Sequence, residues 1–296
     1  MASSEQAGAP FLAKGAVLRL LRRHELRAKK SLGQHFLVNP GALQRILAAA
    51  GLRHDDTIIE VGPGLGVLTR GLLAAAHCVI AVEMDHALAE ILRQDLGADP
   101  HLTIVNGDML ELAPQALLSQ ANARPPYKVV ANLPYNVAAP IIRRFLEAET
   151  PPTSLTVLVQ REVAQGIIAR DGRMSVLAVA TQVYAVPSLA GIVRPGSFLP
   201  PPKVDSAILH LDVRPQPVAI QRSELPLFFL IVRAGFSAPR KQLFNSLAQG
   251  LRIDKALSGA ILGDANVSPQ RRAETLTIEE WAAIARAARD HGIHLP

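Results

Sequence analysis

The sequence predicts an α/β domain with a mostly parallel sheet, followed by a small all-helical C-terminal domain. In the first two thirds of the chain, apolar runs of strand length alternate with helix-length segments, which is typical of a parallel sheet covered by helices on both faces. After the Pro-rich connector Phe198–Lys203 and one further strand, only helical patterns remain. A length of 296 residues suits one large and one smaller domain.

A basic N-terminal arm, residues 1–30, is the first expected part of the chain. Residues 1–10 are small and polar and are expected to be disordered, and the chain becomes helical and basic from Ala16 to Lys30. We interpret this arm as facing RNA or packing on a domain. The alternative is a mitochondrial transit peptide, against which Glu5 and Glu25 count.

The large domain is expected to span residues 31–214. It opens with a helix that ends near Ala50, with Asn39 as its N-cap and Pro40 at its first position. The expected strands are Thr57–Val61, Cys78–Glu83, Leu102–Asn106, Lys128–Asn132, Leu155–Gln160 and Ser206–Val213. The helices expected between them are Val67–Ala76, Ala87–Leu96, Ala138–Ala148 and Arg161–Arg170.

The helical C-terminal domain is expected to span residues 215–296. Its expected helices are Leu225–Ala234, Gln242–Gly250, Asp254–Leu262 and Ile278–Arg289. Their expected caps are Ser223, Asp254 and Thr277, because short polar side chains before an apolar periodic run mark helix starts.

Composition narrows the function classes. The single cysteine, Cys78, excludes an internal disulfide and a zinc site built from cysteines, and it fits a reducing, cytoplasmic location. The nine histidines show no metal-ligand spacing, so no metal site is expected. No apolar run approaches the roughly 18–20 residues that span a bilayer, so no membrane association is expected. A net charge of +6, with basic residues gathered toward both ends, suggests a nucleic-acid partner.

A glycine-rich turn follows the first expected strand. Gly62, Gly64 and Gly66 allow the backbone to turn tightly and to approach a ligand, and the helix that follows offers its positive N-terminal end. Glu83 ends the next strand, where an acid can accept hydrogen bonds from both hydroxyls of a ribose. Together these features predict a nucleotide-like ligand at this edge of the sheet.

Two cofactors use this layout, NAD and S-adenosylmethionine (SAM). Dinucleotide folds favour G-x-G-x-x-G, whereas the spacing here is G-x-G-x-G. Glu60, just before the turn, would repel a pyrophosphate but suits the cationic sulfonium and amino group of SAM. The pattern favours SAM over an NAD oxidoreductase. Asp108, after the third strand, is a candidate acceptor for an adenine amine, or else the cap of a helix that begins near Leu110.

The stretch NLPYN, Asn132–Asn136, ends the fourth strand beside the same cofactor. The exocyclic amine of adenine or cytosine is a poor nucleophile because its lone pair is drawn into the ring. The amide oxygen of Asn132 and the carbonyl of Leu133 can accept its two N–H bonds and direct the lone pair toward the sulfonium. Pro134 stiffens the turn, and Tyr135 can stack on the base. No strong general base is needed, because the methylated ammonium loses its proton readily.

Seven segments resemble the KsgA (RsmA) family of small-subunit rRNA adenine dimethyltransferases. They are KSLGQHFL (Lys30–Leu37), EVGPGLGVLT (Glu60–Thr69), VEMD (Val82–Asp85), NGDML (Asn106–Leu110), NLPYN (Asn132–Asn136), LVQREVA (Leu158–Ala164) and SFLPPPKVDSA (Ser197–Ala207). The resemblance covers about residues 16–290.

The resemblance implies a Rossmann-like, class I SAM-dependent methyltransferase domain. Such an enzyme places two methyl groups on N6 of each of two adjacent adenines near the 3′ end of small-subunit (16S) rRNA, late in ribosome biogenesis, and its docking role implies a monomer. The residues implied to bind SAM are His35, Leu37, Gly62, Gly64, Glu83, Asp108 and Asn132. Those implied at the target base are Asn132, Leu133, Pro134, Tyr135 and Phe198, with the two aromatic rings on either side of the flipped base.

The chain departs from the family pattern at two places. His35 stands where many relatives have Asn, and Phe236–Leu243 matches the basic segment of the family loosely, although Arg240 and Lys241 suit phosphate binding. The alternatives are a large-subunit methyltransferase of the erythromycin-resistance type, a mitochondrial relative that is also a transcription factor, and a non-catalytic assembly factor. The FLPPPKVDSA segment and the N-terminal arm favour the small-subunit enzyme, and the intact site residues argue against lost catalysis.

Overall fold

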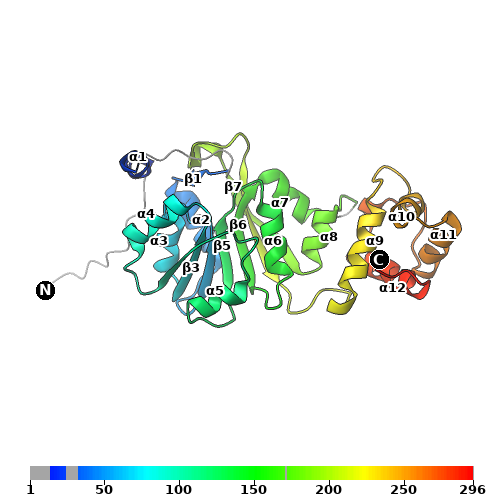
Figure 1. Cartoon of the computed structure of the whole chain (residues 1–296). Helices are drawn as coiled ribbons and strands as arrows, with labels where there is room; N and C mark the ends of the chain where they lie inside the picture. Colours follow the sequence, from blue (N-terminus) through cyan, green and yellow to red (C-terminus); the bar gives the residue numbers. More distant parts are fainter. Residues whose placement is uncertain (1–13, 25–32, 171, 296) are drawn as a thin grey trace. The chain divides into compact units, whose positions relative to one another are not determined.

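The computed structural model describes residues 14–24, 33–170 and 172–295, which form two compact units (Figure 1). The sheet unit contains the described residues up to Ala164 together with Ser188–Val213. The helical unit contains Gln165–Pro187 and the residues from Arg214 onward.

The division between the units after Val213 lies one residue before the expected domain boundary. Residues 165–187, however, belong to a different unit from the one that we expected. We placed this segment in the large domain. It belongs to the helical unit, where α8 (Val176–Gln182) packs against α9 (Leu225–Gly235) and the Arg214 amide donates to the Tyr184 carbonyl at 2.7 Å. These contacts join segments that are far apart in sequence, so local patterns do not reveal them.

A seven-stranded sheet with the order β4-β3-β2-β5-β6-β9-β7 forms the centre of the sheet unit. Neighbouring strands from β4 to β6 are parallel, and β9 is antiparallel to β6. The strands are β2 (Thr57–Val61), β3 (Cys78–Glu83), β4 (Leu102–Asn106), β5 (Lys128–Asn132), β6 (Ser154–Gln160), β7 (Ala185–Val193) and β9 (Ser206–Val213). The strand order reverses between β2 and β5, and in open α/β sheets ligands bind at the carboxyl ends of strands at such a point.

Strand β7 was missing from the expected elements. It contains Pro187 and Gly191, two residues that count against a strand in a sequence pattern, and much of it is exposed. An edge position explains its tolerance of proline, because β7 has only β9 as a neighbour. The six strands that we did expect are present, and only β6 differs in its bounds, beginning at Ser154.

Helices cover both faces of the sheet (Figure 1). They are α2 (Pro40–Ala50), α3 (Val67–Leu73), α4 (His86–Leu96), α5 (Pro114–Gln120), α6 (Ala138–Leu146) and the start of α7 (Arg161–Ile168). The predicted cap is confirmed, since Asn39 Oδ1 accepts from the Ala42 amide at 2.9 Å and Pro40 is the first helical residue. Helix α3 ends at Leu73, earlier than predicted, because the chain must leave the helix to enter β3 at Cys78.

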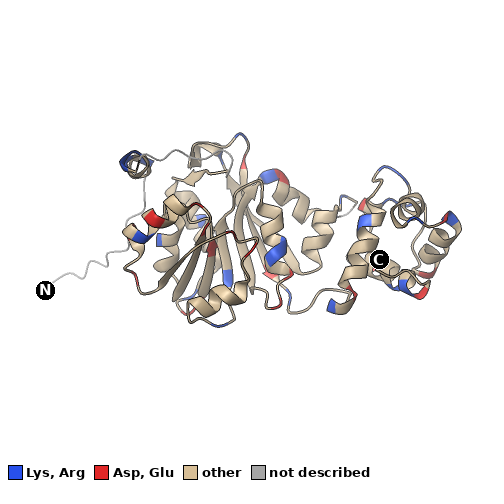
Figure 2. Cartoon of the chain, in the orientation of Figure 1, with Lys and Arg blue, Asp and Glu red and all other residues tan. Residues whose placement is uncertain are grey.

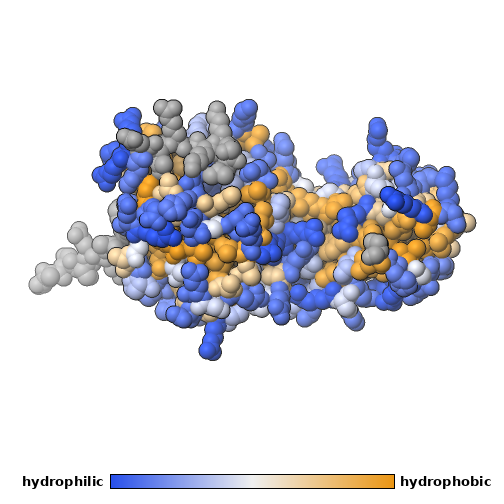
Figure 3. Space-filling model, viewed as in Figure 1, coloured by the Kyte–Doolittle hydropathy of each residue, from blue (hydrophilic) through white to orange (hydrophobic). Residues whose placement is uncertain are grey.

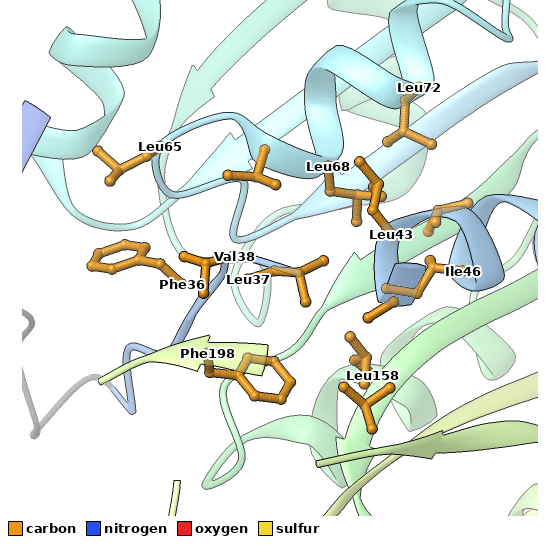
Figure 4. Packing of buried hydrophobic residues seen from close by; sticks show 14 of the residues in the cluster. Phe36, Leu37, Val38, Leu43, Ile46, Leu65, Leu68, Leu72, Leu158 and Phe198 are labelled. Carbon is orange, nitrogen blue, oxygen red and sulfur yellow. The ribbon is translucent and has the colours of Figure 1, made fainter. Parts of the chain in front are cut away.

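A hydrophobic cluster beside the sheet anchors the N-terminal part of the chain (Figure 4). Its members include Leu43 and Ile46 of α2, Leu68 of α3 and Val17 of α1 (Lys14–Arg23). Val17 is completely buried, while Arg22 and Arg23 at the end of α1 are exposed. Helix α1 therefore packs on the sheet unit by one face. The expected disordered residues 1–10 and the end of the expected arm, residues 25–30, lie outside the described residues.

A two-stranded sheet of β1 (Phe36–Leu37) and β8 (Phe198–Leu199) lies over this cluster. Phe36 pairs with Leu199, and Leu37 pairs with Phe198. The Val38 amide extends the pairing by donating to the Ser197 carbonyl at 2.8 Å. Two residues are too few for a periodic pattern, so these strands had no sequence signal. Their pairing connects two of the motifs that we identified separately.

The helical unit consists of α8, α9, α10 (Leu243–Leu251), α11 (Lys255–Asp264), α12 (Ile278–Asp290) and short 3-10 turns. The predicted caps Asp254 and Thr277 are confirmed, because both side chains accept backbone amide hydrogens at the helix starts. The predicted cap Ser223 is wrong. It lies inside the 3-10 turn η3 (Arg222–Glu224), which has its own capping box between Gln221 and Glu224, and α9 then begins without a side-chain cap.

Charged and apolar residues are distributed unevenly over the surface. Figure 2 shows basic residues on α1 and in the loop between α9 and α10. On the face seen in Figure 3, hydrophilic side chains cover most of the surface and hydrophobic residues show between them. Within the described part of the chain, no helix is long and apolar enough to cross a membrane.

Candidate functional site

A pocket of about 340 Å³ opens at the carboxyl ends of β2, β3, β4 and β5. Its walls come from the segment before and within β1, the glycine turn after β2, and the ends of the other three strands. Both the volume and the position are typical of sites for small ligands in α/β proteins. Every predicted cofactor residue lines this pocket, namely His35, Leu37, Gly62, Gly64, Glu83, Asp108 and Asn132.

The glycine turn has the backbone geometry that its sequence predicts. Gly62, Gly64 and Gly66 have φ angles of +69°, +58° and +77°, in the left-handed region that favours glycine. A Cβ atom on Gly64 would lie 3.2 Å from the ring of Phe36. The turn therefore brings bare backbone to the pocket wall, directly against the first strand of the small sheet.

Glu60 is the most deeply buried acid of the pocket, with 1% of its surface exposed. Neither carboxylate oxygen has a hydrogen-bond partner among the residues that the structure describes. Burial raises the pKa of Glu60 to about 8; the neighbouring Thr69 hydroxyl, which lies outside hydrogen-bond geometry, partly opposes this shift, and the Glu83 carboxylate adds to it. A buried acid without a partner favours a cationic ligand, because a nearby positive charge stabilises the carboxylate.

Glu83 is buried and holds the glycine turn in place. Its Oε2 accepts from the Gly64 amide at 3.0 Å, and its Oε1 accepts from the Asp85 amide at 2.9 Å. Burial raises the pKa of Glu83, and these two hydrogen bonds oppose the shift. A carboxylate has about four acceptor positions, so both oxygens can still accept hydroxyl groups. Its predicted contact with a ribose stays a prediction.

Asp108 lies in a turn after β4, and its Oδ1 accepts from the Leu110 amide at 2.8 Å. This bond has the form expected of a helix cap, but the next helix, α5, starts only at Pro114, so Asp108 caps no helix near Leu110. The turn instead fixes the carboxylate at the pocket wall, where Oδ2 remains for an amine of a ligand. The predicted contact with adenine also stays a prediction.

Asn132, the last residue of β5, is oriented by the N-terminal segment. Its Nδ2 donates to the main-chain carbonyl of His35 at 2.9 Å. A carbonyl can only accept, so the opposite atom of the amide, Oδ1, is left for a ligand. The next residue, Leu133, is fixed by a bond from its amide to the Leu158 carbonyl at 3.2 Å, and no group in the described chain donates to its own carbonyl. Both residues line the pocket, and their predicted contact with a target amine stays a prediction.

The ring of Tyr135 is partly buried and has two partners. It stacks on His35, with 5.4 Å between ring centroids and 29° between planes, and its hydroxyl lies 2.5 Å from Ser206 Oγ. The side chain of Phe198 is 3% exposed and packs in the hydrophobic cluster (Figure 4). Its predicted stacking on the base opposite Tyr135 stays a prediction, and it would require the ring to turn out of this cluster.

The structure also shows site residues that we did not predict. Ser206 belongs to a quoted motif, but no spacing rule places it against Tyr135. Gln34 connects the N-terminal segment to the turn after β3, through a 3.2 Å bond from Nε2 to Asp85 Oδ2. Both contacts join distant parts of the sequence, so only co-variation between related sequences would give a signal for them.

Arg240 and Lys241, the predicted RNA contacts, are exposed in the loop between α9 and α10 of the helical unit. Lys241 Nζ donates to Gln249 Oε1 at 3.3 Å. Because this partner is a neutral amide, the bond does not neutralise the charge of Lys241. As for metals, the described residues contain no cluster of three or more His, Cys, Asp or Glu side chains that could bind an ion.

Comparisons with known proteins agree on one family. The family model described as ribosomal RNA adenine dimethylase matches residues 25–284. A ribosomal RNA small subunit methyltransferase A of Dehalococcoides mccartyi is 46% identical over 275 residues, which is 93% of each chain. The proteins of the same name in Alkaliphilus oremlandii and Clostridium botulinum are 40% and 37% identical and cover at least 90% of this chain.

Solved structures give the same fold. The 23S rRNA methyltransferase ErmE is 30% identical with a TM-score of 0.67, over 85% of this chain and 98% of that protein. A dimethyladenosine transferase from Plasmodium falciparum superposes with a TM-score of 0.73 over 88% of this chain and 99% of its own, at 23% identity, which supports the fold alone.

Proposed function

This chain belongs to the ribosomal RNA adenine dimethylase family, and on that premise we propose that it dimethylates N6 of two adjacent adenines near the 3′ end of small-subunit (16S) rRNA. The family makes it an rRNA methyltransferase that uses SAM as methyl donor. The observation that supports the adenine chemistry best is the pair of fixed acceptors, Asn132 Oδ1 and the Leu133 carbonyl, at the wall of the pocket.

The pocket fits SAM. Glu60, which is buried and has no hydrogen-bond partner among the described residues, suits a ligand with cationic groups, and the glycine turn leaves room for it against bare backbone. Leu37, Gly62 and Gly64 would bind it through this turn and through β1, together with His35 main chain, Glu83 at a ribose, Asp108 at an adenine and Asn132. When bound, SAM supplies a methyl group on a positively charged sulfur.

The residues of NLPYN prepare the target amine. Asn132 Oδ1 and the Leu133 carbonyl accept its two N–H bonds, so that the nitrogen lone pair is directed into the pocket and away from the ring. Pro134 lines the pocket and keeps this turn rigid. Tyr135 does not line the pocket itself, but as the next residue it offers a face on which the flipped base can stack. The proton that the amine loses on methylation passes to water.

The small subunit is favoured over the large subunit by sequence identity along the whole chain. The three relatives named small subunit methyltransferase A that are reported above are 37–46% identical over at least 90% of this chain, whereas the large-subunit enzyme ErmE is 30% identical over 85%. Catalytic cores alone would not separate these classes, because both act on adenine. We further propose that the protein acts as a monomer in the cytoplasm, on small subunits during their assembly.

The test is methyl transfer from labelled SAM to three substrates: small subunits that lack these modifications, intact large subunits, and bare tRNA. We expect dimethyladenine, located by mass spectrometry, in small-subunit rRNA only. Label in large-subunit rRNA would support the resistance-type alternative. Tight binding to small subunits without any label would support a non-catalytic assembly factor.

The catalytic control is Asn132→Ala. Because this change removes an acceptor for the target amine, we expect turnover to fall by roughly 10²–10³-fold, the usual effect of losing one such preorganised group. SAM affinity should weaken much less, since most of the pocket wall remains. A matched variant, Asn245→Ala in the helical unit, should retain the activity of the wild type. Unchanged turnover in Asn132→Ala would rule out the proposed role of the amide.

A further inference from the structure

The ring of Tyr135 is held at two places that lie far apart in the sequence. On its face is the imidazole of His35, stacked at 5.4 Å, and at its tip is Ser206 Oγ, 2.5 Å from the phenol oxygen. Ser206 is completely buried, at the first position of β9. Burial raises the pKa of the Tyr135 hydroxyl, with the Ser206 bond opposing the shift, so the two hydroxyls form a neutral hydrogen bond.

His35 is itself fixed from three directions. Its Nδ1 lies 2.8 Å from the Pro200 carbonyl, which can only accept, so Nδ1 carries the hydrogen. Its own carbonyl accepts from Asn132, and the residue after it, Phe36, is paired with Leu199 in the small sheet. The main chain around His35 is therefore anchored to β5 and β8, and the imidazole cannot turn away from Tyr135 without breaking its bond to the Pro200 carbonyl.

From these contacts we propose that His35 and Ser206 are positioning residues for the target base, which act by fixing the ring of Tyr135. This proposal rests on the proposed function, because it assigns Tyr135 the role of a stacking surface. His35 forms a permanent wall behind the ring, so the adenine stacks on the face that His35 leaves open. Ser206 prevents the ring from turning about its side-chain bonds.

The physical reason is preorganisation. An adenine that has been flipped from the RNA must meet the acceptors of Asn132 and Leu133 with its amine in line, and a misplacement of about 1 Å can cost around 10²-fold in rate. Tyr135 follows these acceptors by only a few residues, so its ring sets the plane of the base. His35 orients both parts at once: its main chain holds the Asn132 amide, and its side chain holds the ring.

Substitutions of His35 can test this role, because an asparagine could supply only one of the two side-chain contacts that His35 makes, with the Pro200 carbonyl and with the Tyr135 ring. An asparagine side chain can donate to the Pro200 carbonyl, but it has no ring to stack on Tyr135. The variants His35→Asn and His35→Phe therefore separate the two contacts, since the first keeps a donor and the second keeps a ring. We expect His35→Asn to lower kcat about tenfold, whereas His35→Phe should keep most of the wild-type kcat.

SAM affinity distinguishes this role from a direct contact of the His35 side chain with the cofactor. For His35→Asn we expect the Kd for SAM to stay within about threefold of the wild type while kcat falls. A Kd for SAM that rises more than tenfold with kcat unchanged would overturn the proposal, because His35 would then act on the cofactor and not on Tyr135.

A double-mutant cycle tests Ser206. If Ser206 acts through the Tyr135 hydroxyl, Ser206→Ala and Tyr135→Phe remove the same bond, so the double variant should be no slower than the slower single variant. We expect each single change to lower kcat about tenfold. Losses that multiply in the double variant would overturn the proposal. Ser258→Ala is the matched control, since Ser258 is equally buried but donates to the Phe244 carbonyl in the helical unit.

A readout that needs no activity separates this proposal from the proposed function. The chain has only three tyrosines, so protein labelled with 3-fluorotyrosine should give three ¹⁹F resonances, assignable by Tyr→Phe changes. We expect Ser206→Ala and His35→Asn to shift the Tyr135 resonance and to leave those of Tyr127 and Tyr184 in place. An unshifted Tyr135 resonance would overturn the positioning role even in an active enzyme, whereas absent methyl transfer by the wild type would contradict only the proposed function.

Discussion

At the scale of single residues, Glu60 is the side chain whose chemistry depends most on its surroundings. It is the last residue but one of β2, a strand whose residues are all buried, and it has no hydrogen-bond partner in the described chain. Its carboxyl group is therefore neutral over much of the range in which other acids are ionised, with a pKa of about 8. A cationic ligand reverses this situation by stabilising the charged form.

This pKa gives a pH dependence of stability that can be measured without SAM. The pKa is about 8 in the folded protein and 4.5 ordinarily, so the folded state binds the proton more tightly. The resulting stabilisation is fully present below about pH 4.5 and is lost as the pH rises through 8. The unfolding temperature of Glu60→Gln should therefore rise relative to that of the wild type between pH 5 and pH 9.

Calorimetry at pH 5, 7 and 9 would provide this comparison. Glu279→Gln is the control, because Glu279 is exposed on α12 and its replacement should leave the wild-type pH profile unchanged. A constant difference in unfolding temperature between Glu60→Gln and the wild type at all three pH values would contradict the prediction.

At the scale of structural elements, the glycine turn between β2 and α3 depends on a backbone that other residues do not adopt easily. Gly64 has a φ of +58°, and a Cβ atom there would press on the Phe36 ring at 3.2 Å. We expect Gly64→Ala to lower the free energy of unfolding by about 1–3 kcal/mol and to weaken SAM binding. Urea denaturation and a SAM titration would measure the two effects.

The control for this change is Gly259→Ala in helix α11, where a Cβ atom would meet nothing within 4 Å. Alanine is the better helix former, so this variant should be as stable as the wild type or slightly more stable. Equal stabilities of Gly64→Ala and the wild type would show that the turn tolerates a side chain.

Helix α12 provides a second test at this scale. Thr277 Oγ1 accepts from the Glu280 amide at 3.2 Å, and Glu280 Oε2 accepts from the Thr277 amide at 2.8 Å, so the two residues form a capping box. We expect Thr277→Ala to cost about 1 kcal/mol of stability in chemical denaturation. Ser223→Ala should cost little, because Ser223 does not cap α9. Equal losses for both variants would contradict this assignment.

At the scale of the whole molecule, the charge of +6 indicates how the protein meets its polyanionic substrate. Arg240 and Lys241 are exposed neighbours in the helical unit, and neither lines the pocket. Removing both should weaken binding to small subunits and lower the slope of log K against log salt by about 0.7–0.9 per phosphate contact. Methyl transfer at saturating subunit concentration should change little.

Filter binding over a range of salt concentrations would measure this slope. Arg53→Ala is a suitable control, because Arg53 is an exposed basic residue that already pairs with Asp55 at 3.2 Å. An unchanged slope in the Arg240→Ala/Lys241→Ala double variant would show that these residues do not contact phosphates.

Local patterns in the sequence determined most of the elements and several of the residues that line the pocket. Apart from β4, the strands of the parallel sheet are mostly buried runs, and the glycine turn must be glycine because its φ angles are positive. Glu83, Asp108 and Asn132 were predictable for a related reason: each lies at the end of a parallel strand or just after it, and such ends share one edge of the sheet. Family resemblance then supplied the substrate.

The tertiary structure alone decided what local patterns cannot encode. The pairing of β1 with β8, the bond from Asn132 to His35, and the position of Ser206 at Tyr135 all join residues more than 70 positions apart. The edge strand β7, which lies beside β9, and the burial of Phe198 in the cluster were also decided by the tertiary structure. The physical reason is that these contacts depend on which segments the completed sheet brings together, whereas helix caps and glycine turns depend on neighbours within a few residues.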